Sequence, residues 1–258
     1  MDLLSVIGLI AGVGFVLYGY IMEGGSLASL GMLSSTFIVF GGSFGALCLS
    51  YGMKQVKKLP ILFIEIFKEP KVTVSETIDF LVRLSQTAKE NGLLSLEKAV
   101  SDGNVDPFIK RGILSVVDGT DAEKISEIMQ NDIYVYEQDR ILSISMLDAL
   151  GGYTPAFGMV GTIVGMIHTL SAGSSDAAQL TQAISIAFTA TLYGVAAANL
   201  IFIPMATKLK NRLADYRLEK EMIINAVCSI RNGINPKMLK EQLSSYLILG
   251  SKSAKRSS

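Results

Sequence analysis

The sequence predicts an all-α membrane protein with four transmembrane helices and a large cytoplasmic helical domain. Half of its 258 residues are hydrophobic and only 18% are charged, against about 25% in a typical soluble domain. The hydrophobic residues gather in four stretches, each close to the roughly 20 residues that a spanning helix needs. No alternating strand pattern competes with the helical ones.

The order of these stretches predicts the organisation of the chain. The four spans are expected at residues 3–22, 33–53, 149–170 and 180–206. The connections within each pair of spans are too short for more than a turn. The predicted parts are the first two spans (1–53), a helical domain (54–148), the last two spans (149–206) and a helical tail (207–258).

Start and stop signals indicate how the polar parts fold. An Asn-Gly pair at 91–92 is typical of a helix end, and an Asp-Pro pair at 106–107 is typical of a helix start. Thr120 and Glu123 form a capping pair that opens a helix expected to continue into the third span. In the tail, an Asn-Pro pair starts a short final helix, and the polar, basic end at 251–258 is expected to be disordered.

The basic residues predict the orientation. All 23 Lys and Arg residues lie within 54–140 and 208–256, and none lies in the two short connections. Cytoplasmic loops collect Lys and Arg. We therefore expect the long middle segment and both termini on the cytoplasmic side. The first hydrophobic stretch lacks a basic start and is interpreted as a span rather than a cleaved signal.

The third and fourth spans carry almost no charge. Between Gly151 and Pro204 the only charged residue is Asp176, in the short connection. Transport proteins usually carry a charged residue at membrane depth. If this chain conducts ions, the titrating group must therefore come from another chain.

These two spans are instead rich in small residues and hydroxyl groups. Glycines recur on the third span (Gly158, Gly161, Gly165), and small residues recur on the fourth (Ala183, Ala187, Thr191, Gly194, Ala198). Such faces let helices approach closely. Two interpretations stay open: packing within one subunit, or a smooth wall against which a partner helix turns.

Four residues of these spans are candidate functional groups. The hydroxyls of Thr162 and Thr191 are able to ligate a cation or bind a carboxyl group, or simply to bond back to a carbonyl one turn earlier. Pro155 and Pro204 each remove a helical hydrogen bond, and they are either a pair of hinges at matching depth or harmless kinks.

Other classes of function find no support. The formal net charge is zero, so nucleic-acid binding is not indicated. The sequence has a single histidine, His168, and no metal-ligand cluster, phosphate-binding glycine loop or His-centred triad. We predict neither an enzyme nor a cofactor.

Three runs of residues resemble one family. TPAFGMVGTIVG at 154–165 is similar to the third-span signature of the MotA and PomA flagellar stator proteins. TLYG at 191–194 is similar to their fourth span, and NGLLSLE at 91–97 to their rotor-facing segment. With the topology, the resemblance covers nearly the whole chain.

The resemblance implies a stator subunit of the flagellar motor, a multi-pass protein of the bacterial inner membrane. It implies a homo-pentamer around a MotB-type dimer that supplies the essential aspartate. Such a complex conducts H⁺ or Na⁺ down its gradient and converts this flow into torque. The runner-up is the ExbB/TolQ type, which energises outer-membrane processes, but those chains typically have three spans and an outside N-terminus.

The resemblance also assigns residues. Pro155 and Pro204 match the family's prolines, and Thr191 matches its pore threonine. Lys89 and Glu97 match charged positions that contact the rotor protein FliG. The second threonine of the ion pathway, Thr162, resembles the sodium-driven relatives, although one hydroxyl does not decide selectivity. A merely structural membrane protein would tolerate loss of the Thr191 hydroxyl.

Overall fold

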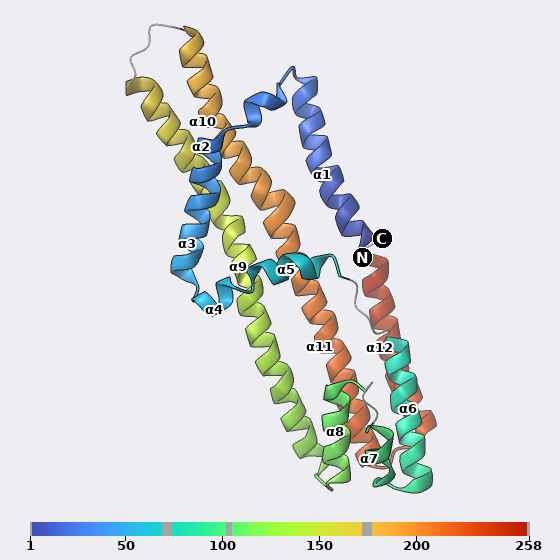
Figure 1. The fold of residues 1–258 in the computed structure, drawn as a ribbon. Coiled ribbons are helices and arrows are strands. Elements are labelled where there is room, and N and C mark those ends of the chain that lie inside the picture. Colours follow the sequence, from blue (N-terminus) through green and yellow to red (C-terminus); the bar gives the residue numbers. More distant parts are fainter. Residues whose placement is uncertain (1, 69–73, 102–104, 172–176, 257–258) are drawn as a thin grey trace. The chain divides into compact units, whose positions relative to one another are not determined.

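The structure is a computed structural model, and it describes residues 2–68, 74–101, 105–171 and 177–256. Within those residues it contains helices and no strand (Figure 1). The chain forms two compact units, each made of two segments: residues 1–69 with 141–210, and residues 70–140 with 211–258. We call them the first and the second unit.

The first unit begins with two spans. α1 (Leu3–Met22) is one uninterrupted helix. The second span consists of α2 (Leu33–Thr36), the π-helical turn η2 (Phe37–Gly41) and α3 (Gly42–Ser50). Two short helices follow, α4 (Met53–Val56) and α5 (Leu59–Ile66). The second span ends at Ser50 rather than at residue 53, because the backbone is extended at the next two residues.

Two long helical runs contribute to both units. α9 (Ala122–Ser171) carries the third span. α10 (Ala177–Ala197), the π-helical turn η3 (Ala198–Phe202) and α11 (Ile203–Arg231) carry the fourth. Among the described residues, four helical runs are long and apolar enough to cross a membrane. This confirms the four expected spans and the continuous helix into the third. Asp176 lies outside the described residues.

The described part of the second unit contains four further helices. They are α6 (Val74–Asn91), α7 (Ser95–Ala99), α8 (Pro107–Val117) and α12 (Pro236–Arg256). Gly92 ends α6 with a φ of +80°, where a side chain would be strained. The carboxylate of Asp106 accepts a hydrogen bond from the Phe108 backbone N–H at 2.7 Å, which caps α8. Both predicted helix boundaries are confirmed.

The last helix is longer than expected. α12 continues to Arg256, so it includes most of the segment that we expected to be disordered. Residues 251–256 read SKSAKR and contain neither proline nor glycine. Lys, Ala and Arg are strong helix formers, so nothing in this stretch stops the helix.

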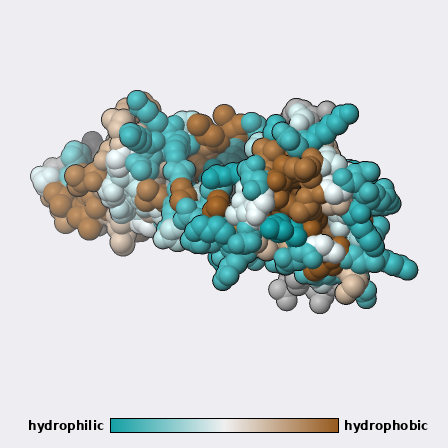
Figure 2. Space-filling model, turned by 90° about the horizontal axis from the view of Figure 1, so that it is seen from below, coloured by the Kyte–Doolittle hydropathy of each residue, from teal (hydrophilic) through white to brown (hydrophobic). Residues whose placement is uncertain are grey.

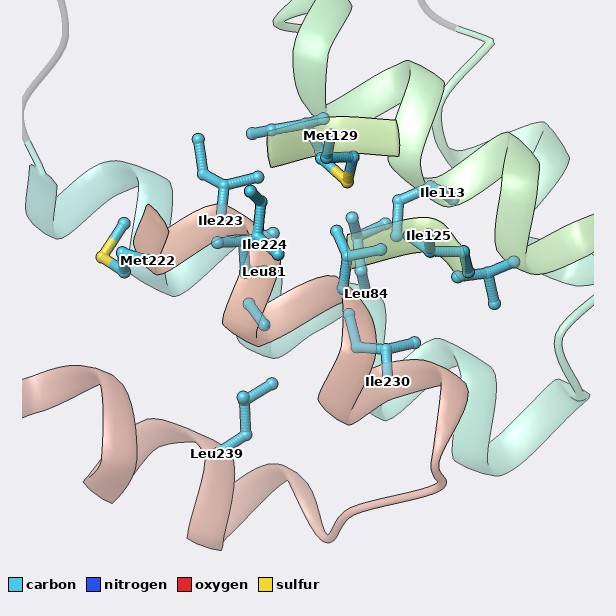
Figure 3. Close-up of a cluster of buried hydrophobic side chains, with 14 of the residues drawn as sticks. Leu81, Leu84, Ile113, Ile125, Met129, Met222, Ile223, Ile224, Ile230 and Leu239 are labelled. Atoms are coloured by element: carbon cyan, nitrogen blue, oxygen red, sulfur yellow. The ribbon is translucent and has the colours of Figure 1, made fainter. Parts of the chain in front are cut away.

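The second unit has a hydrophobic core of its own. Figure 3 shows side chains from α6, α8, α9, α11 and α12 meeting in one cluster. Its largest fully buried members include Leu81, Ile113, Ile125, Met129 and Met222. Leu96 of α7 belongs to the same cluster. Burying one such side chain contributes about 1.5–3 kcal/mol, so among the described residues this cluster holds six separate helices together. The face in Figure 2 interleaves hydrophilic (teal) with hydrophobic (brown) residues.

Candidate functional site

The two candidate threonines meet at the contact between α9 and α10. The Thr162 and Thr191 hydroxyls are hydrogen-bonded to each other. Thr162 Oγ1 also lies 3.0 Å from the Ala187 carbonyl oxygen and 3.2 Å from that of Gly158. Thr191 Oγ1 lies 3.3 Å from the same Gly158 oxygen. The structure therefore brings these two sequence-predicted residues together.

Four oxygens converge at this contact. Two are hydroxyls, and two are the carbonyls of Gly158 and Ala187, each four residues before one of the threonines. Each hydroxyl has one proton to donate and two lone pairs, so lone pairs remain at the cluster. Both threonines are half-buried. Oxygen-only surroundings suit hard cations, and a hydroxyl is also able to donate to a carboxylate.

The simple back-bonding interpretation fits one threonine better than the other. Thr162 reaches the carbonyl of Gly158, one turn earlier on its own helix. Thr191 instead reaches across to Gly158 on α9. Each hydroxyl thus reaches a carbonyl oxygen on the opposite helix, so back-bonding within one helix does not account for either threonine.

Small residues make this close approach possible. A Cβ on Gly158 would lie only 3.1 Å from the Ala190 carbonyl oxygen and 3.2 Å from Thr191 Cα. A Cβ on Gly165 would lie 2.7 Å from that of Ala187. The small-residue faces thus pack α9 against α10 within one chain. For these glycines, the geometry supports the interpretation as packing within one subunit.

The two prolines differ in their local structure. Pro155 lies inside α9, which remains α-helical through it. Pro204 is the second residue of α11 and follows the π-helical turn η3. A proline has no N–H for the carbonyl four residues earlier, and π-helical turns are frequent at functional sites. The interruption of regular helix therefore accompanies Pro204 alone.

The prolines also lie at different depths. A Cβ on Gly194 would lie 3.1 Å from Pro155 Cα, so Pro155 is level with Gly194. A Cβ on Gly151 would meet the Ile203 side chain at 2.7 Å. Pro204 is therefore nearer the level of Gly151. The two prolines therefore do not lie at matching depth, and a π-helical turn interrupts the regular helix only beside Pro204.

Lys89 and Glu97 flank one turn of the second unit. Lys89 lies in the last turn of α6 and Glu97 lies on α7. Both side chains are exposed. The turn between them is fixed by Gly92 and by Leu96, which is fully buried. The two charges are thus presented to solvent by a rigid turn.

Sequence reasoning missed a buried ion pair in the second unit. Lys220 Nζ lies 2.6 Å from Asp106 Oδ2, and the lysine side chain is only 7% exposed. Nζ also lies 5.3 Å from the ring centres of Phe108 and Tyr216. Burial, with nearby Tyr136 and Asp106 adding to it, raises the pKa of Tyr216 to about 12. The Asp-Pro pair signalled a cap, but nothing local pointed to a lysine 114 residues away.

Comparisons with known proteins cover nearly the whole chain. The motility protein A N-terminal family matches residues 6–92, and the MotA/TolQ/ExbB proton channel family matches residues 100–222. Motility protein A of Treponema phagedenis is 36% identical over 96% of this chain and 94% of its own length. Motility protein A of Bacillus subtilis is 33% identical over 96% and 91%. The chain belongs to the MotA/TolQ/ExbB proton channel family.

Solved structures place it on the MotA side of that family. The flagellar MotAB stator complex from Bacillus subtilis contains a chain with 32% identity and a TM-score of 0.89, covering 96% of both chains. The match includes the early pair of spans. The runner-up, the ExbB/TolQ type, typically lacks this pair. MotA-type proteins form a channel family rather than an enzyme family, as the sequence predicts.

Proposed function

We propose that this chain is a stator subunit of the bacterial flagellar motor. With a MotB-type partner it conducts cations down their gradient and converts this flow into torque on the rotor. The observation that carries the proposal is the Thr162–Thr191 pair, which gathers four oxygens in two spans that contain no Asp, Glu, Lys or Arg of their own.

A partner chain supplies the missing carboxylate. Between Gly151 and Pro204 the only charged residue is Asp176, in the short connection. A charged group at membrane depth must therefore come from another helix. The similar solved structures are MotAB complexes, which supports a MotB-type partner. We propose a homo-pentamer of this chain around a dimer of that partner, in the inner membrane, with both termini in the cytoplasm.

The coupling follows from the cost of a charge near an apolar wall. A cation from outside reaches the partner's carboxylate beside Thr162 and Thr191 and neutralises it, which lowers the cost of burying that group. The pentamer then steps around the dimer. Each elementary charge that crosses the membrane releases about 2.3 kcal/mol per 100 mV. We propose η3 and Pro204 as the place where the fourth span changes shape during a step.

The transported ion is H⁺ or Na⁺, and no bound cofactor takes part. The paired hydroxyls are compatible with Na⁺, whose ligands are oxygens. Swimming speed measured with and without Na⁺, at a fixed membrane potential, distinguishes the two. A speed that is independent of Na⁺ means proton transport.

The cytoplasmic turn with Lys89 and Glu97 makes the rotor contact, with FliG. Its two exposed charges of opposite sign favour a partner surface of complementary pattern. The double variant Lys89→Glu with Glu97→Lys reverses both charges. Each would then face a charge of the same sign on the rotor protein, and torque is expected to fall strongly. The matched control is Lys237→Glu, an exposed lysine on α12. Unchanged torque in the double variant would remove the charged contact from the mechanism.

A clean deletion of the gene tests the function as a whole. Cells that keep normal filaments but do not swim, and that swim again when the gene is restored, support the stator function. Cells that swim normally, with no second stator system to cover the loss, overturn it. Defects in outer-membrane processes instead of motility would favour the ExbB/TolQ-like role.

A further inference from the structure

The short helix α5 is apolar on two opposite sides. Leu62 and Ile66 are buried in the first unit, 1% and 3% exposed. Ile61 and Ile64 point away from the unit and are 60% and 57% exposed. A helix that is hydrophobic all round is not stable against water. Its outer side therefore requires an apolar surrounding.

Basic residues accompany this apolar side. The segment 53–68 contains Lys54, Lys57, Lys58 and Lys68 against a single acidic residue, Glu65. Lys54, Lys57 and Lys68 are exposed, and Lys58 is half-buried. Lys54 lies in α4 (Met53–Val56), and Lys57 and Lys58 follow directly in the turn before α5, so three of the four lysines fall within five residues.

The segment is fixed at the end of a span. It starts directly after α3 ends at Ser50, and α5 runs across the direction of α3 rather than along it (Figure 1). The Phe63 and Phe202 rings lie 6.3 Å apart at 82°, which ties α5 to η3. The backbone N–H of Asp2 donates to the Phe67 carbonyl at 3.0 Å, which ties it to the start of α1.

We propose that α4 and α5 form an interfacial segment that binds acidic phospholipid headgroups. Ile61 and Ile64 enter the boundary between headgroups and acyl chains, where amphipathic helices bury their apolar side. Lys54, Lys57 and Lys68 bind the headgroup phosphates, as basic clusters next to a span do. Lipid binding by this segment is linked to η3 through the contact between Phe63 and Phe202. It does not depend on the ion pathway.

The chemistry favours lipid over the other partners. A free phosphate would neutralise the lysines but leave the two isoleucines in water. A second copy of this segment would bring like charges together, since it carries four lysines and one glutamate. An acidic lipid surface satisfies both features at once.

A tryptophan reporter tests this directly, because the chain contains no tryptophan. Ile64→Trp, in the full complex with the MotB-type partner, is reconstituted into vesicles of phosphatidylcholine and phosphatidylglycerol. Bromine is placed on the acyl chains of one lipid or the other at equal mole fraction. The reporter signal is the difference in fluorescence from the unmodified complex, and brominated chains quench a tryptophan that they touch.

We expect strong quenching by both lipids and a preference for phosphatidylglycerol. About 1 kcal/mol for each lysine near an acidic surface corresponds to a relative association constant of about five-fold or more. The triple variant Lys54→Gln, Lys57→Gln and Lys68→Gln is expected to abolish the preference while quenching remains. The control variant Lys237→Gln with Lys240→Gln, on α12, is expected to keep it.

Two results overturn the proposal. Equal quenching by both lipids, unaffected by the triple variant, means a membrane position without headgroup recognition. Absence of quenching means that protein, and not lipid, covers the segment. Met53→Trp, at a position that is 70% exposed, repeats the measurement in case a tryptophan at 64 disturbs folding.

Discussion

The hydroxyls of Thr162 and Thr191 are hydrogen-bonded to each other across the contact between α9 and α10. The two residues are 29 positions apart, and each comes from a different span. Their meeting depends on glycines: a Cβ on Gly158 would press on the backbone of the opposite helix. The oxygen cluster and the tight helix contact are therefore one structure, and a change in either affects the other.

Removing one hydroxyl of this pair is expected to impair ion conduction. Thr191→Val keeps the shape of the side chain but removes a ligand or hydrogen-bond donor worth about 0.5–1.5 kcal/mol, so we expect up to about ten-fold less cation flux. Thr191→Ser, which keeps the oxygen, should conduct. Cation flux into vesicles containing the complex measures both.

Thr189→Val is the matched control for this prediction. Thr189 is a buried threonine of the same helix, and its hydroxyl donates only locally, to the Ser185 carbonyl at 2.8 Å. We expect almost normal flux. If Thr189→Val and Thr191→Val reduce flux equally, the pair has no special role in conduction.

A side chain at Gly194 is expected to force α9 and α10 apart. Its Cβ would lie 3.1 Å from Gly158 Cα and from Pro155 Cα, and backbone atoms cannot rotate away. Overpacking of this kind costs about 1–3 kcal/mol. Thermal unfolding of purified Gly194→Ala should show lowered stability. Gly45→Ala in α3, which has open space at this position, should be neutral or stabilising, and equal effects would contradict the account.

Breaking the buried ion pair of the second unit is expected to be costly. Lys220→Met leaves the Asp106 carboxylate, which is 34% exposed, without its charged partner. Because water still reaches this carboxylate, we expect a cost between the roughly 0–1 kcal/mol of an exposed pair and the roughly 3–5 kcal/mol of a fully buried one. By contrast, Lys240 and Asp79 form a pair whose side chains are 63% and 51% exposed, and such pairs contribute about 0–1 kcal/mol. Chemical denaturation should therefore separate Lys220→Met clearly from Lys240→Met.

Glu219 gives the second unit a predicted pH dependence. Burial raises the pKa of Glu219 above its ordinary value, and Asp106 adds to the effect while Lys220 opposes it. Folding thus favours the protonated form. This contribution to stability is complete below about pH 4.5, the ordinary value, and is lost as the pH rises through the folded-state pKa.

Glu219→Gln mimics the protonated form at every pH. We expect it to raise the melting temperature at neutral pH and to give no gain below about pH 4.5. The exposed Glu241 on α12 offers a control, and Glu241→Gln should change little. A melting temperature of Glu219→Gln that falls at neutral pH would contradict the predicted direction.

The sequence was sufficient for features that depend on local chemistry. Runs of about 20 apolar residues located the spans, and the Asn-Gly and Asp-Pro pairs located the end of α6 and the start of α8. These signals work because helix ends must satisfy their own backbone groups within a few residues.

Features that depend on the meeting of distant segments could not be predicted. The sequence showed small residues on both spans but not that Gly158 meets Thr191 rather than a partner chain. It showed Asp106 as a cap but not its bond to Lys220. The π-helical turn η2 (Phe37–Gly41) contains no proline that would signal it, whereas η3 lies just before Pro204.

In our proposal, this chain converts ion flow into torque. The most direct test is the rotation of single tethered cells of a deletion strain while the chain is expressed anew. We predict that rotation speed rises in discrete steps as complexes join the motor, and falls to zero when the ion gradients are collapsed. Rotation that starts without the chain, or that continues after both the H⁺ and the Na⁺ gradients are gone, would contradict the claim.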